Sequence, residues 1–269
     1  MSKVKVVFSD IDGTLLRSDH TVSPRTANSI AQAIAKGIDF VPVSARMPEA
    51  IRPITDSMDL RTPVIAYNGG LILDNADNVL HSITMPWQVA QAVCRYTQDH
   101  SPEVYWNAYS YKSWLSQGRE FYWIAREEEI VGLQSTEAQL DDFETYQAFH
   151  KILVMGEPEG LTQFQEKLKQ AFPELSIVKS LPHLLEVMAT GVEKVLAVKT
   201  YQEIVGVNRE ETIAFGDNYN DLAMFDQVGT AYVMGNAPEE IQKRYGHVTA
   251  DHDHDGIAEV LDRLMEGIE

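Results

Sequence analysis

The feature that most constrains the fold is a short apolar run that ends in two closely spaced carboxylates. Residues 4–8 are mostly β-branched or aromatic, which is typical of a buried strand. Asp10 and Asp12 follow this run, and Gly13 permits a sharp exit from the strand. In an open α/β sheet, ligands bind at the carboxyl ends of the strands. The pattern therefore predicts a strand that delivers two acidic side chains to a binding site.

The same pattern recurs near the other end of the sequence. Residues 211–215 favour another strand, and a segment from Gly216 to Asp221 that contains Asp217 follows it. Carboxylates this close together repel one another unless a cation or a shared proton relieves them. Two such clusters on neighbouring parallel strands would share one hard, oxygen-preferring cation, for which Mg²⁺ is the best candidate. We therefore expect a Mg²⁺ site built from both ends of the chain.

Strand and helix patterns alternate through the first third of the chain. Ser23 followed by Pro24 predicts a helix start, and Gly37 predicts its end. Further strands are expected over residues 38–43 and 64–67. Such alternation implies a parallel sheet with right-handed crossovers. We predict the α/β class, with a parallel-sheet core that carries helices on both faces.

The composition changes in the middle of the chain. Residues 84–188 contain all four tryptophans and most of the tyrosines, with short strand patterns among helical ones. Strand–helix alternation returns after this segment. We therefore predict a discontinuous core of residues 1–83 and 189–269, interrupted by an inserted α+β domain over residues 84–188.

Composition and charge exclude several classes of protein. The chain has 269 residues and a formal net charge of −18, which disfavours nucleic acid or an anionic membrane as a partner. Cys94 is the sole cysteine, so an intramolecular disulfide or a thiolate metal cluster is impossible. The N-terminal apolar run is broken by Lys5 and does not resemble a signal peptide, and no membrane-spanning run is present. A cytoplasmic protein is expected.

Four motifs in this order resemble those of the haloacid dehalogenase superfamily of phosphotransferases. They are Asp-x-Asp-Gly-Thr from Asp10, Ser44 after the second strand, Lys194 before the last cluster, and Gly-Asp-x-x-Asn-Asp from Gly216. Asn68-Gly69, and the tail from Val248-Thr249 to Asp255-Gly256, resemble the Cof-like sugar-phosphatase branch. The resemblance implies a Rossmann-like core and a cap that closes over the site. Ser44-Ala45-Arg46 departs from the usual Ser/Thr-Gly-Arg, which puts the fit of the substrate in doubt.

The resemblance also implies a role for each motif residue. Asp10 is the expected nucleophile and Asp12 the general acid and base, with Lys194 neutralising charge. Asp10, the backbone carbonyl of Asp12, and Asp217 are the expected Mg²⁺ ligands, and Asp221 would orient Lys194 or a bound water. The expected phosphate-binding residues are Ser44, Ala45, Arg46, Asn68, Gly69, Lys194 and Asn220.

Simpler interpretations of some of these residues are open. Ser44 and Asp217 could cap helices, Lys194 could be a solvated surface lysine, and Asn68-Gly69 is a frequent turn. The run from His252 to Asp255 resembles a metal site, but we interpret it as a solvated loop before a helix.

These observations predict a Mg²⁺-dependent phosphatase that hydrolyses a small phosphorylated metabolite, with a sugar phosphate as the leading class, through an aspartyl-phosphate. A phosphomannomutase-like phosphotransferase is the alternative enzyme. A non-catalytic protein that binds a phosphorylated metabolite is the alternative from another class. The sequence does not distinguish a monomer from a dimer.

Overall fold

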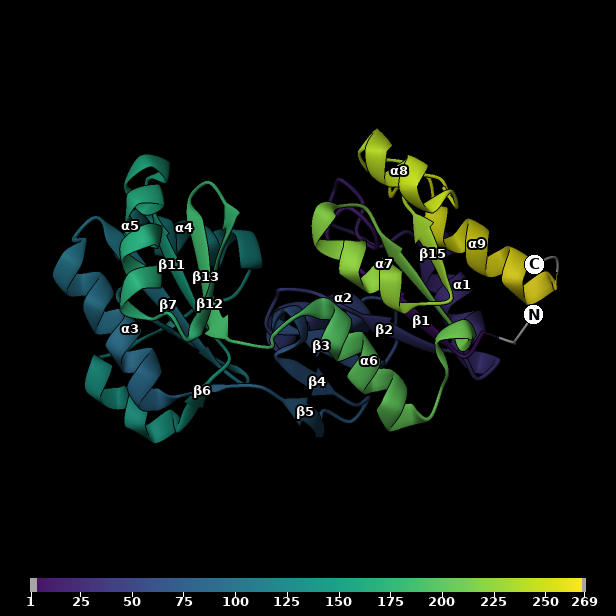
Figure 1. Cartoon of the computed structure of the whole chain (residues 1–269). Helices are drawn as coiled ribbons and strands as arrows, with labels where there is room; N and C mark the ends of the chain where they lie inside the picture. Colours follow the sequence, from purple (N-terminus) through teal and green to yellow (C-terminus); the bar gives the residue numbers. More distant parts are fainter. Residues whose placement is uncertain (1–3, 268–269) are drawn as a thin grey trace. The chain divides into compact units, whose positions relative to one another are not determined.

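The computed structural model describes residues 4–267, which form two compact units (Figure 1). One unit comprises the chain up to Ser82 and from Glu193 onward, and the other comprises Ile83–Val192. The boundaries between the two units thus lie between residues 82 and 83 and between residues 192 and 193. The boundaries predicted from the sequence lie between residues 83 and 84 and between residues 188 and 189. Each unit has its own hydrophobic core. No helix in the described residues is both long and apolar enough to cross a membrane.

The discontinuous unit is built on a four-stranded parallel sheet in the order β15-β14-β1-β2. The strands are β1 (Val6–Ser9), β2 (Asp39–Pro42), β14 (Thr212–Gly216) and β15 (Thr230–Val233). Strand β1 is central and pairs in parallel with both β2 and β14. The segments from the two ends of the sequence are therefore neighbours, and their carboxyl ends lie at the same edge of the sheet.

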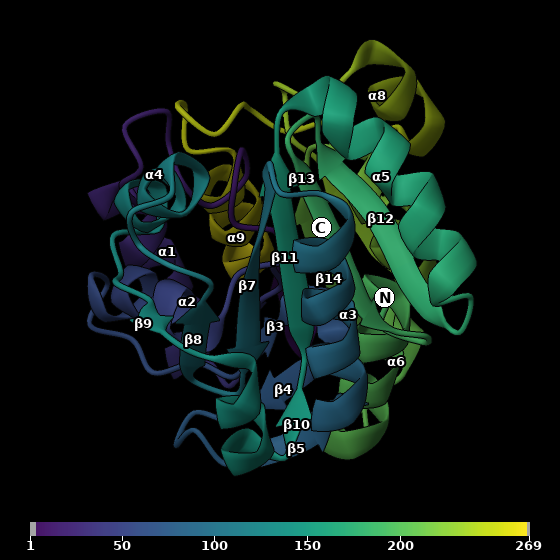
Figure 2. The same ribbon diagram turned by 90° about the vertical axis from the view of Figure 1, so that its left-hand side faces the viewer.

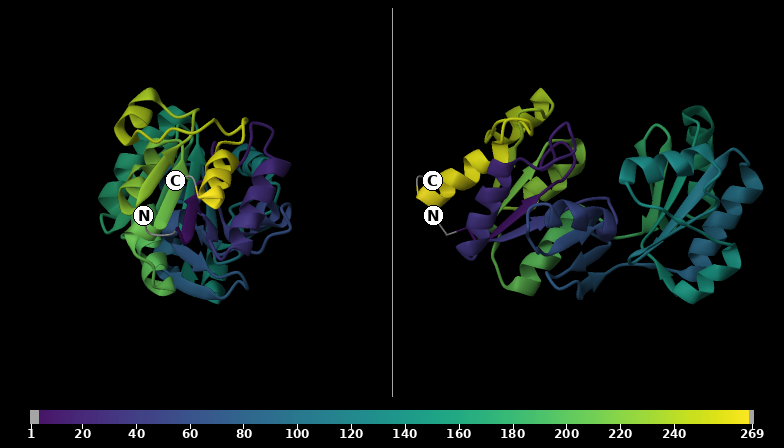
Figure 3. Two further views of the ribbon diagram at one scale, coloured as in Figure 1. Left: turned by 90° about the vertical axis from the view of Figure 1, so that its right-hand side faces the viewer. Right: turned by 180° about the vertical axis from the view of Figure 1, so that it is seen from behind.

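Side chains alternate along β1 because successive residues of a strand point to opposite faces of the sheet. Val6 and Phe8 join the core on one face, whereas Val7 joins the core on the other face. The first face is covered by α6 (Lys194–Val205), α7 (Leu222–Gln227) and α8 (Glu239–Tyr245), and the second by α1 (Pro24–Ala35) and α9 (Gly256–Glu266) (Figure 3). The predicted α/β class, with helices on both faces, is confirmed.

Local signals set the helix boundaries. Ser23 accepts a hydrogen bond from the Thr26 amide at 3.0 Å and Pro24 occupies the first turn of α1, as expected of an N-cap. Helix α1 ends at Ala35, and Gly37 has a φ of +82°. Helix α2 (Pro48–Asp56) also begins at a proline.

A small antiparallel sheet extends this unit next to β2. It consists of β3 (Val64–Ala66), β4 (Leu71–Leu73) and β5 (Val79–Ser82) in the order β3-β4-β5. A single parallel bridge between Val43 and Ile65 connects it to the end of β2. The turn between β3 and β4 therefore lies near the carboxyl edge of the parallel sheet.

The inserted unit contains a six-stranded sheet in the order β12-β13-β11-β7-β8-β9 (Figure 2). All its pairings are antiparallel except that of β8 with β9. Its strands are β7 (Val104–Ser110), β8 (Ser113–Ser116), β9 (Thr136–Glu137), β11 (Lys151–Gly156), β12 (Leu175–Leu181) and β13 (Leu184–Ala189).

Helices α3 (Trp87–His100) and α5 (Pro158–Ala171) cover one face of this sheet. Val93 of α3 and Phe164 of α5 pack with Trp106 and Ile152 of the sheet in one core. Helix α4 (Tyr122–Val131) contacts β7 and β11. A two-stranded pair, β6 (Met85–Pro86) with β10 (Ala148–Phe149), completes the unit. This unit can thus bury its apolar side chains against one another.

Candidate active site

The two acidic clusters meet at the carboxyl ends of β1 and β14. The strands pair in register, with Ser9 opposite Phe215, and the Asp10 amide donates to the Phe215 carbonyl at 3.0 Å. Carboxylate oxygens of Asp10, Asp217 and Asp221 lie within 4.8 Å of one another. The expectation that both ends of the sequence contribute to one cluster therefore agrees with the geometry.

Lys194 links two of these carboxylates. Its Nζ donates to Asp10 Oδ1 at 2.6 Å and to Asp221 Oδ1 at 2.8 Å, and the three residues are 5%, 6% and 0% exposed. Lys194 begins α6, so the helix places its ammonium group at the sheet edge. Such deep burial rules out the interpretation of Lys194 as a solvated surface lysine.

Burial and ion pairing act in opposite directions on these groups. Burial raises the pKa of Asp10 to about 7, although the Lys194 ammonium opposes that rise. The pKa of Lys194 rises because the attraction of Asp10 and Asp221 outweighs its own burial. Burial also raises the pKa of Asp217, while its hydrogen bond from Thr14 opposes the shift. The protein's own cationic and hydrogen-bonding groups thus compensate only part of the negative charge of these carboxylates.

Both carboxylate oxygens of Asp221 accept hydrogen bonds from the protein. While its Oδ1 accepts from Lys194, its Oδ2 accepts from the amides of Asp217 and Asn218 at 3.1 and 3.2 Å. A side chain at Gly216 would approach Asp221 Oδ2 to 2.7 Å, so glycine is required at that position. The hydrogen bond to Lys194 is the contact that the expected orienting role of Asp221 requires, and that role stays a prediction.

Asp217 is held by two side-chain donors from other segments. Thr14 Oγ1 donates to its Oδ1 at 2.9 Å, and Asn236 Nδ2 donates to its Oδ2 at 3.3 Å. Gly13 has a φ of +78°, and a Cβ there would lie 2.5 Å from Asp217 Oδ2. The loop after β1 can therefore pass Asp217 only with glycine at position 13.

Asp12 and Arg46 form an ion pair at the rim of the site. Arg46 donates to both Asp12 oxygens, from Nε at 3.0 Å and from the terminal nitrogen at 2.6 Å. The Asp12 side chain is 55% exposed. Arg46, which the sequence suggested as a phosphate-binding residue, thus contacts the expected general acid in this structure.

The segment from Ser44 to Arg46 follows β2 and the bridge residue Val43. Ser44 is buried, and its Oγ accepts from the Arg46 amide at 3.2 Å. Ala45 lies between them and is half-buried. This position, at the carboxyl end of β2, matches the expected place of the motif.

Asn68 and Gly69 lie in a strained turn (Tyr67–Gly69) that joins β3 to β4. Tyr67, Asn68 and Gly69 have φ values of +54°, +55° and +106°, and such values are uncommon for residues other than glycine. The amides of Tyr67 and Asn68 donate to the carbonyls of Arg46 and Ser44 at 3.1 and 2.8 Å. The turn therefore fixes the backbone of the Ser44–Arg46 segment.

Asn220 lies in a short 3₁₀ helix (Tyr219–Asp221) and is exposed. It immediately precedes Asp221, at the same edge of the sheet as Asp217. Among the described residues, no hydrogen bond links its side chain to the acidic cluster, so its phosphate-binding role stays a prediction.

Sequence reasoning missed Asn236 and gave Thr14 no role of its own. Asn236 follows β15 by three positions, and its Nδ2 also donates to the Gly13 carbonyl at 2.9 Å. A polar residue just after the last parallel strand was the available signal, because that edge of the sheet binds ligands.

The donor set at this edge fits a hard divalent cation. Three carboxylates against the single ammonium of Lys194 leave two uncompensated negative charges. Carboxylate oxygens are the ligands that Mg²⁺ prefers. Burial raises the pKa of both Asp10 and Asp217, so the site by itself disfavours their charged forms. Carboxylate oxygens of Asp10, Asp217 and Asp221 lie close enough together to hold such a cation.

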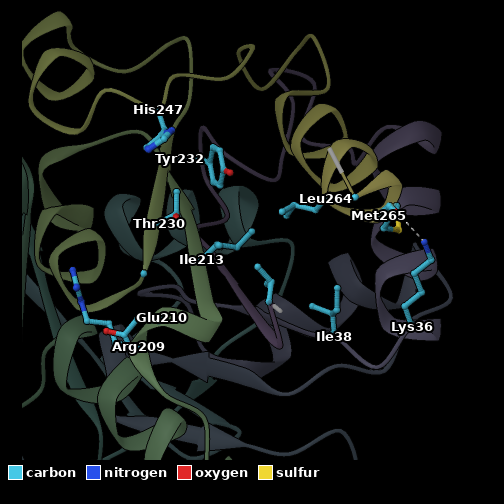
Figure 4. Close-up of a pocket in the computed structure, with 13 residues that line it drawn as sticks. Lys36, Ile38, Arg209, Glu210, Ile213, Thr230, Tyr232, His247, Leu264 and Met265 are labelled. Atoms are coloured by element: carbon cyan, nitrogen blue, oxygen red, sulfur yellow. Dashed lines mark hydrogen bonds between the residues drawn. The ribbon is translucent and has the colours of Figure 1, made fainter. Parts of the chain in front are cut away.

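A cavity of about 950 Å³ lies at the other end of the parallel sheet, where β14 and β15 begin and α9 ends (Figure 4). Figure 4 shows Lys36 and Arg209 on opposite sides of it. Lys36 donates to the Met265 carbonyl at 3.1 Å and Arg209 to the Asp226 carbonyl at 3.3 Å. These cations bond to backbone carbonyls and do not converge on one point, so the cavity does not resemble an anion site.

Comparisons with known proteins show which family this chain resembles. The sequence profile of a family described as haloacid dehalogenase-like hydrolase matches residues 7–261. A Haemophilus influenzae protein, whose name assigns it provisionally to the phosphatases, is 36% identical over 258 residues, which cover 96% of this chain and 97% of that protein. A Bacillus subtilis protein, 5-amino-6-(5-phospho-D-ribitylamino)uracil phosphatase YwtE, is 25% identical over 98% of this chain and 99% of its own.

Solved structures show the same fold. The crystal structure of a haloacid dehalogenase-like hydrolase from Bacteroides thetaiotaomicron superposes with a TM-score of 0.88 at 26% identity. The superposition covers 97% of this chain and 100% of that one. The similarity therefore extends over both units.

Proposed function

This chain belongs to the haloacid dehalogenase-like hydrolases and is a phosphatase, and on that premise we propose that it hydrolyses a sugar phosphate through an aspartyl-phosphate at Asp10. The observation that carries the proposal is the buried Asp10 carboxylate, of which Lys194 occupies one oxygen. In the described residues, no side chain donates a hydrogen bond to the other oxygen, Oδ2. That oxygen is the one available for attack on phosphorus.

In the first step, Asp10 Oδ2 forms a bond to phosphorus and the ester P–O bond breaks. The leaving oxygen takes a proton from Asp12, which is the general acid. Lys194 holds Asp10 Oδ1, so the attacking carboxylate keeps its orientation while its charge is spread onto the phosphoryl group. The product of this step is an alcohol and a phosphorylated Asp10.

In the second step, a water attacks phosphorus and Asp12 accepts its proton. The bond from phosphorus to Asp10 breaks, which releases inorganic phosphate and restores the carboxylate. Ser44 lies at the carboxyl end of β2, where its hydroxyl would donate to a phosphate oxygen. The cycle consumes one water and leaves the enzyme unchanged.

Mg²⁺ is part of the proposal. Asp10 and Asp217, with the backbone carbonyl of Asp12, would hold it, and it would neutralise charge on the phosphoryl oxygens. Thr14 and Asn236 orient the Asp217 carboxylate, while Lys194 balances Asp10 from the buried side.

Asp12 can act as an acid only after its pair with Arg46 opens. Both Asp12 oxygens accept from Arg46, so neither is directed at a leaving group. A substrate phosphate is a strong competing acceptor for a guanidinium. We therefore propose that a bound phosphate attracts Arg46 away from Asp12, which leaves Asp12 free to transfer a proton.

A sugar or related polyol phosphate is the proposed substrate class. The name of the related YwtE specifies a phosphate on a ribityl chain, which is a phosphomonoester of a polyol. Selection of the substrate by the inserted unit stays a prediction. So does a cytoplasmic location, which is supported by a sole cysteine, Cys94, that is buried and free.

The test is phosphate release from a panel of sugar phosphates, with and without Mg²⁺, by the native protein and by Asp10→Asn. We expect Mg²⁺-dependent release that falls by at least about a thousandfold in the variant, because an amide is a poor nucleophile. Circular dichroism serves as the control that the variant is folded. Equal release by both proteins would rule out Asp10 as the nucleophile.

The two alternative functions predict different results. A phosphotransferase of the phosphomannomutase type would transfer phosphate to a second sugar hydroxyl, which appears as an isomerised sugar phosphate and not as free phosphate. A binding protein would retain a phosphorylated metabolite without releasing phosphate, and Asp10→Asn would retain it equally well.

A further inference from the structure

Asn236 connects three segments that are distant in the sequence. Its Nδ2 donates to the Gly13 carbonyl at 2.9 Å and to Asp217 Oδ2 at 3.3 Å, while its Oδ1 accepts from the His252 amide at 3.3 Å. A carbonyl only accepts and a backbone amide only donates, so these partners fix which end of the Asn236 amide faces which segment. Both the donor and the acceptor group of this exposed side chain therefore have hydrogen-bond partners.

The Asp217 carboxylate depends on Asn236 for one of its two oxygens. Thr14 orients Oδ1, and the absence of a side chain at Gly13 leaves space beside Oδ2. Asn236 supplies the donor on that second side and also binds the Gly13 carbonyl, so it holds Asp217 and the loop after β1 at a fixed separation. Two donors on two oxygens determine the plane of the carboxylate.

The loop from Asp251 to Asp255 holds Asn236 through the His252 amide and is itself hydrogen-bonded to the segment after β1. Asp253 accepts from the Ser18 amide at 2.9 Å and from the Ser18 hydroxyl at 2.6 Å. Asp255 accepts from the Ser23 hydroxyl. This loop is therefore tied to the same segment, residues 13–23, that passes Asp217. Asp253 and Asp255 make these contacts, whereas Asp251 accepts from the Asp253 amide within the loop, and the His252 amide donates to Asn236.

We propose that Asn236 is a positioning residue that, tethered by the loop from Asp251 to Asp255, orients Asp217 to bind the divalent cation. The inference rests on the proposed function, since it concerns the cation that the acidic cluster would hold. Groups that orient a metal ligand typically change metal affinity 10- to 100-fold when they are removed. Without Asn236, the Asp217 carboxylate could rotate away from the orientation shared with Asp10.

The test is calorimetric titration of Mg²⁺ into the native protein, Asn236→Leu and Asn236→Ala. Leucine keeps the size of the side chain and removes its hydrogen bonds, and alanine removes both. Because Asn236 is exposed, both variants should fold, which thermal unfolding without Mg²⁺ would verify. We expect Mg²⁺ affinity to fall about tenfold in both variants, with the unfolding temperature without Mg²⁺ nearly unchanged.

Two further variants make the result specific. Asn75→Leu is the matched control, since it makes the same chemical change at an exposed position in the β4–β5 hairpin, and it should bind Mg²⁺ like the native protein. Asp217→Asn removes the proposed ligand itself and should abolish binding. The KM for substrate at saturating Mg²⁺ should stay native in Asn236→Leu, because its effect acts through the cation.

The outcomes separate this inference from the proposed function. Native Mg²⁺ affinity in Asn236→Leu, with binding lost in Asp217→Asn, would overturn the inference and leave the metal centre intact. Absence of Mg²⁺ binding by the native protein would overturn the metal centre and the inference with it.

Discussion

Individual buried polar residues in this protein depend on specific partners. His150 is completely buried in the inserted unit, and its Nδ1 accepts a hydrogen bond from the Tyr111 amide at 3.1 Å. Only an unprotonated nitrogen can accept that bond. Burial therefore favours the neutral ring and lowers the pKa of His150 to about 4.

We expect His150 to make the native protein less stable as pH falls. The unfolded chain binds a proton near pH 6.5 and the folded protein only near pH 4, so the stabilisation is complete above pH 6.5. It is lost progressively as pH falls from 6.5 through 4, by on the order of 3 kcal/mol in total. Denaturant unfolding of native protein and His150→Asn between pH 7 and pH 4 measures the difference.

The asparagine variant keeps an acceptor near the Tyr111 amide and does not titrate, so its stability should fall less over that range. His20→Asn is the matched control at an exposed histidine and should follow the native curve. Parallel curves for native protein and His150→Asn would contradict the prediction.

At the scale of elements, the Tyr67–Gly69 turn and helix α6 are in close contact. A Cβ on Gly69 would lie 2.7 Å from the Ala197 Cβ and 2.8 Å from the Glu193 carbonyl oxygen. The turn also binds the Ser44–Arg46 segment through its amides. It therefore locates the first turn of α6, and with it Lys194, relative to Ser44.

Gly69→Ala should reduce both stability and turnover. The added methyl group must displace α6, and alanine is strained at a φ of +106°, for a combined cost of roughly 2–4 kcal/mol. Displacement of Lys194 from Asp10 should also lower kcat by about tenfold or more. Denaturant unfolding and steady-state kinetics on the same preparation measure the two effects.

Gly206 at the other end of α6 is the matched control. It has a φ of +68° and open space around its Cα, so alanine there adds backbone strain of about 1 kcal/mol without a collision. Gly206→Ala should keep native kcat. Equal kinetics in the two variants would show that the turn does not position Lys194.

At the scale of the whole molecule, the chain divides into a unit that holds the acidic cluster and a unit inserted into it. The inserted unit buries its own core around Trp106 and Phe164, and its sheet pairs within Ile83–Val192. By contrast, every residue of the acidic cluster comes from outside the insertion.

We therefore expect an isolated fragment of residues 83–192 to fold. It should unfold in one cooperative transition, followed by circular dichroism, because its core is complete without the other unit. Trp106→Ala in the fragment should lower its stability by about 3–5 kcal/mol, since the side chain is fully buried. A fragment without a cooperative transition would contradict the prediction.

The complementary experiment replaces residues 83–192 by a flexible Gly/Ser linker. The remaining unit should retain native Mg²⁺ affinity, because it contains Asp10, Asp217, Lys194 and Asn236. Loss of Mg²⁺ binding by a folded linker protein would show that the inserted unit contributes to the metal centre.

Much of the fold and part of the site followed from the sequence alone. The strand pattern at residues 4–8 and the helix start at Ser23-Pro24 are local patterns. The structure has the strand over Val6–Ser9, and α1 begins at Pro24 with Ser23 as its N-cap. The α/β class and the family resemblance were also evident, because apolar periodicity and short motifs are properties of neighbouring residues.

Only the tertiary structure decided how distant side chains meet. Arg46 lies against Asp12, Asn236 beside Asp217, and Lys194 between Asp10 and Asp221. These pairs are separated by 19 to 184 positions in the sequence. Their approach depends on strand order and register and on the path of the loops, all of which are set by packing of the whole core. The sequence by itself therefore determined the helices, the strands and the acidic residues. Only the tertiary packing decided which side chains these acidic residues contact.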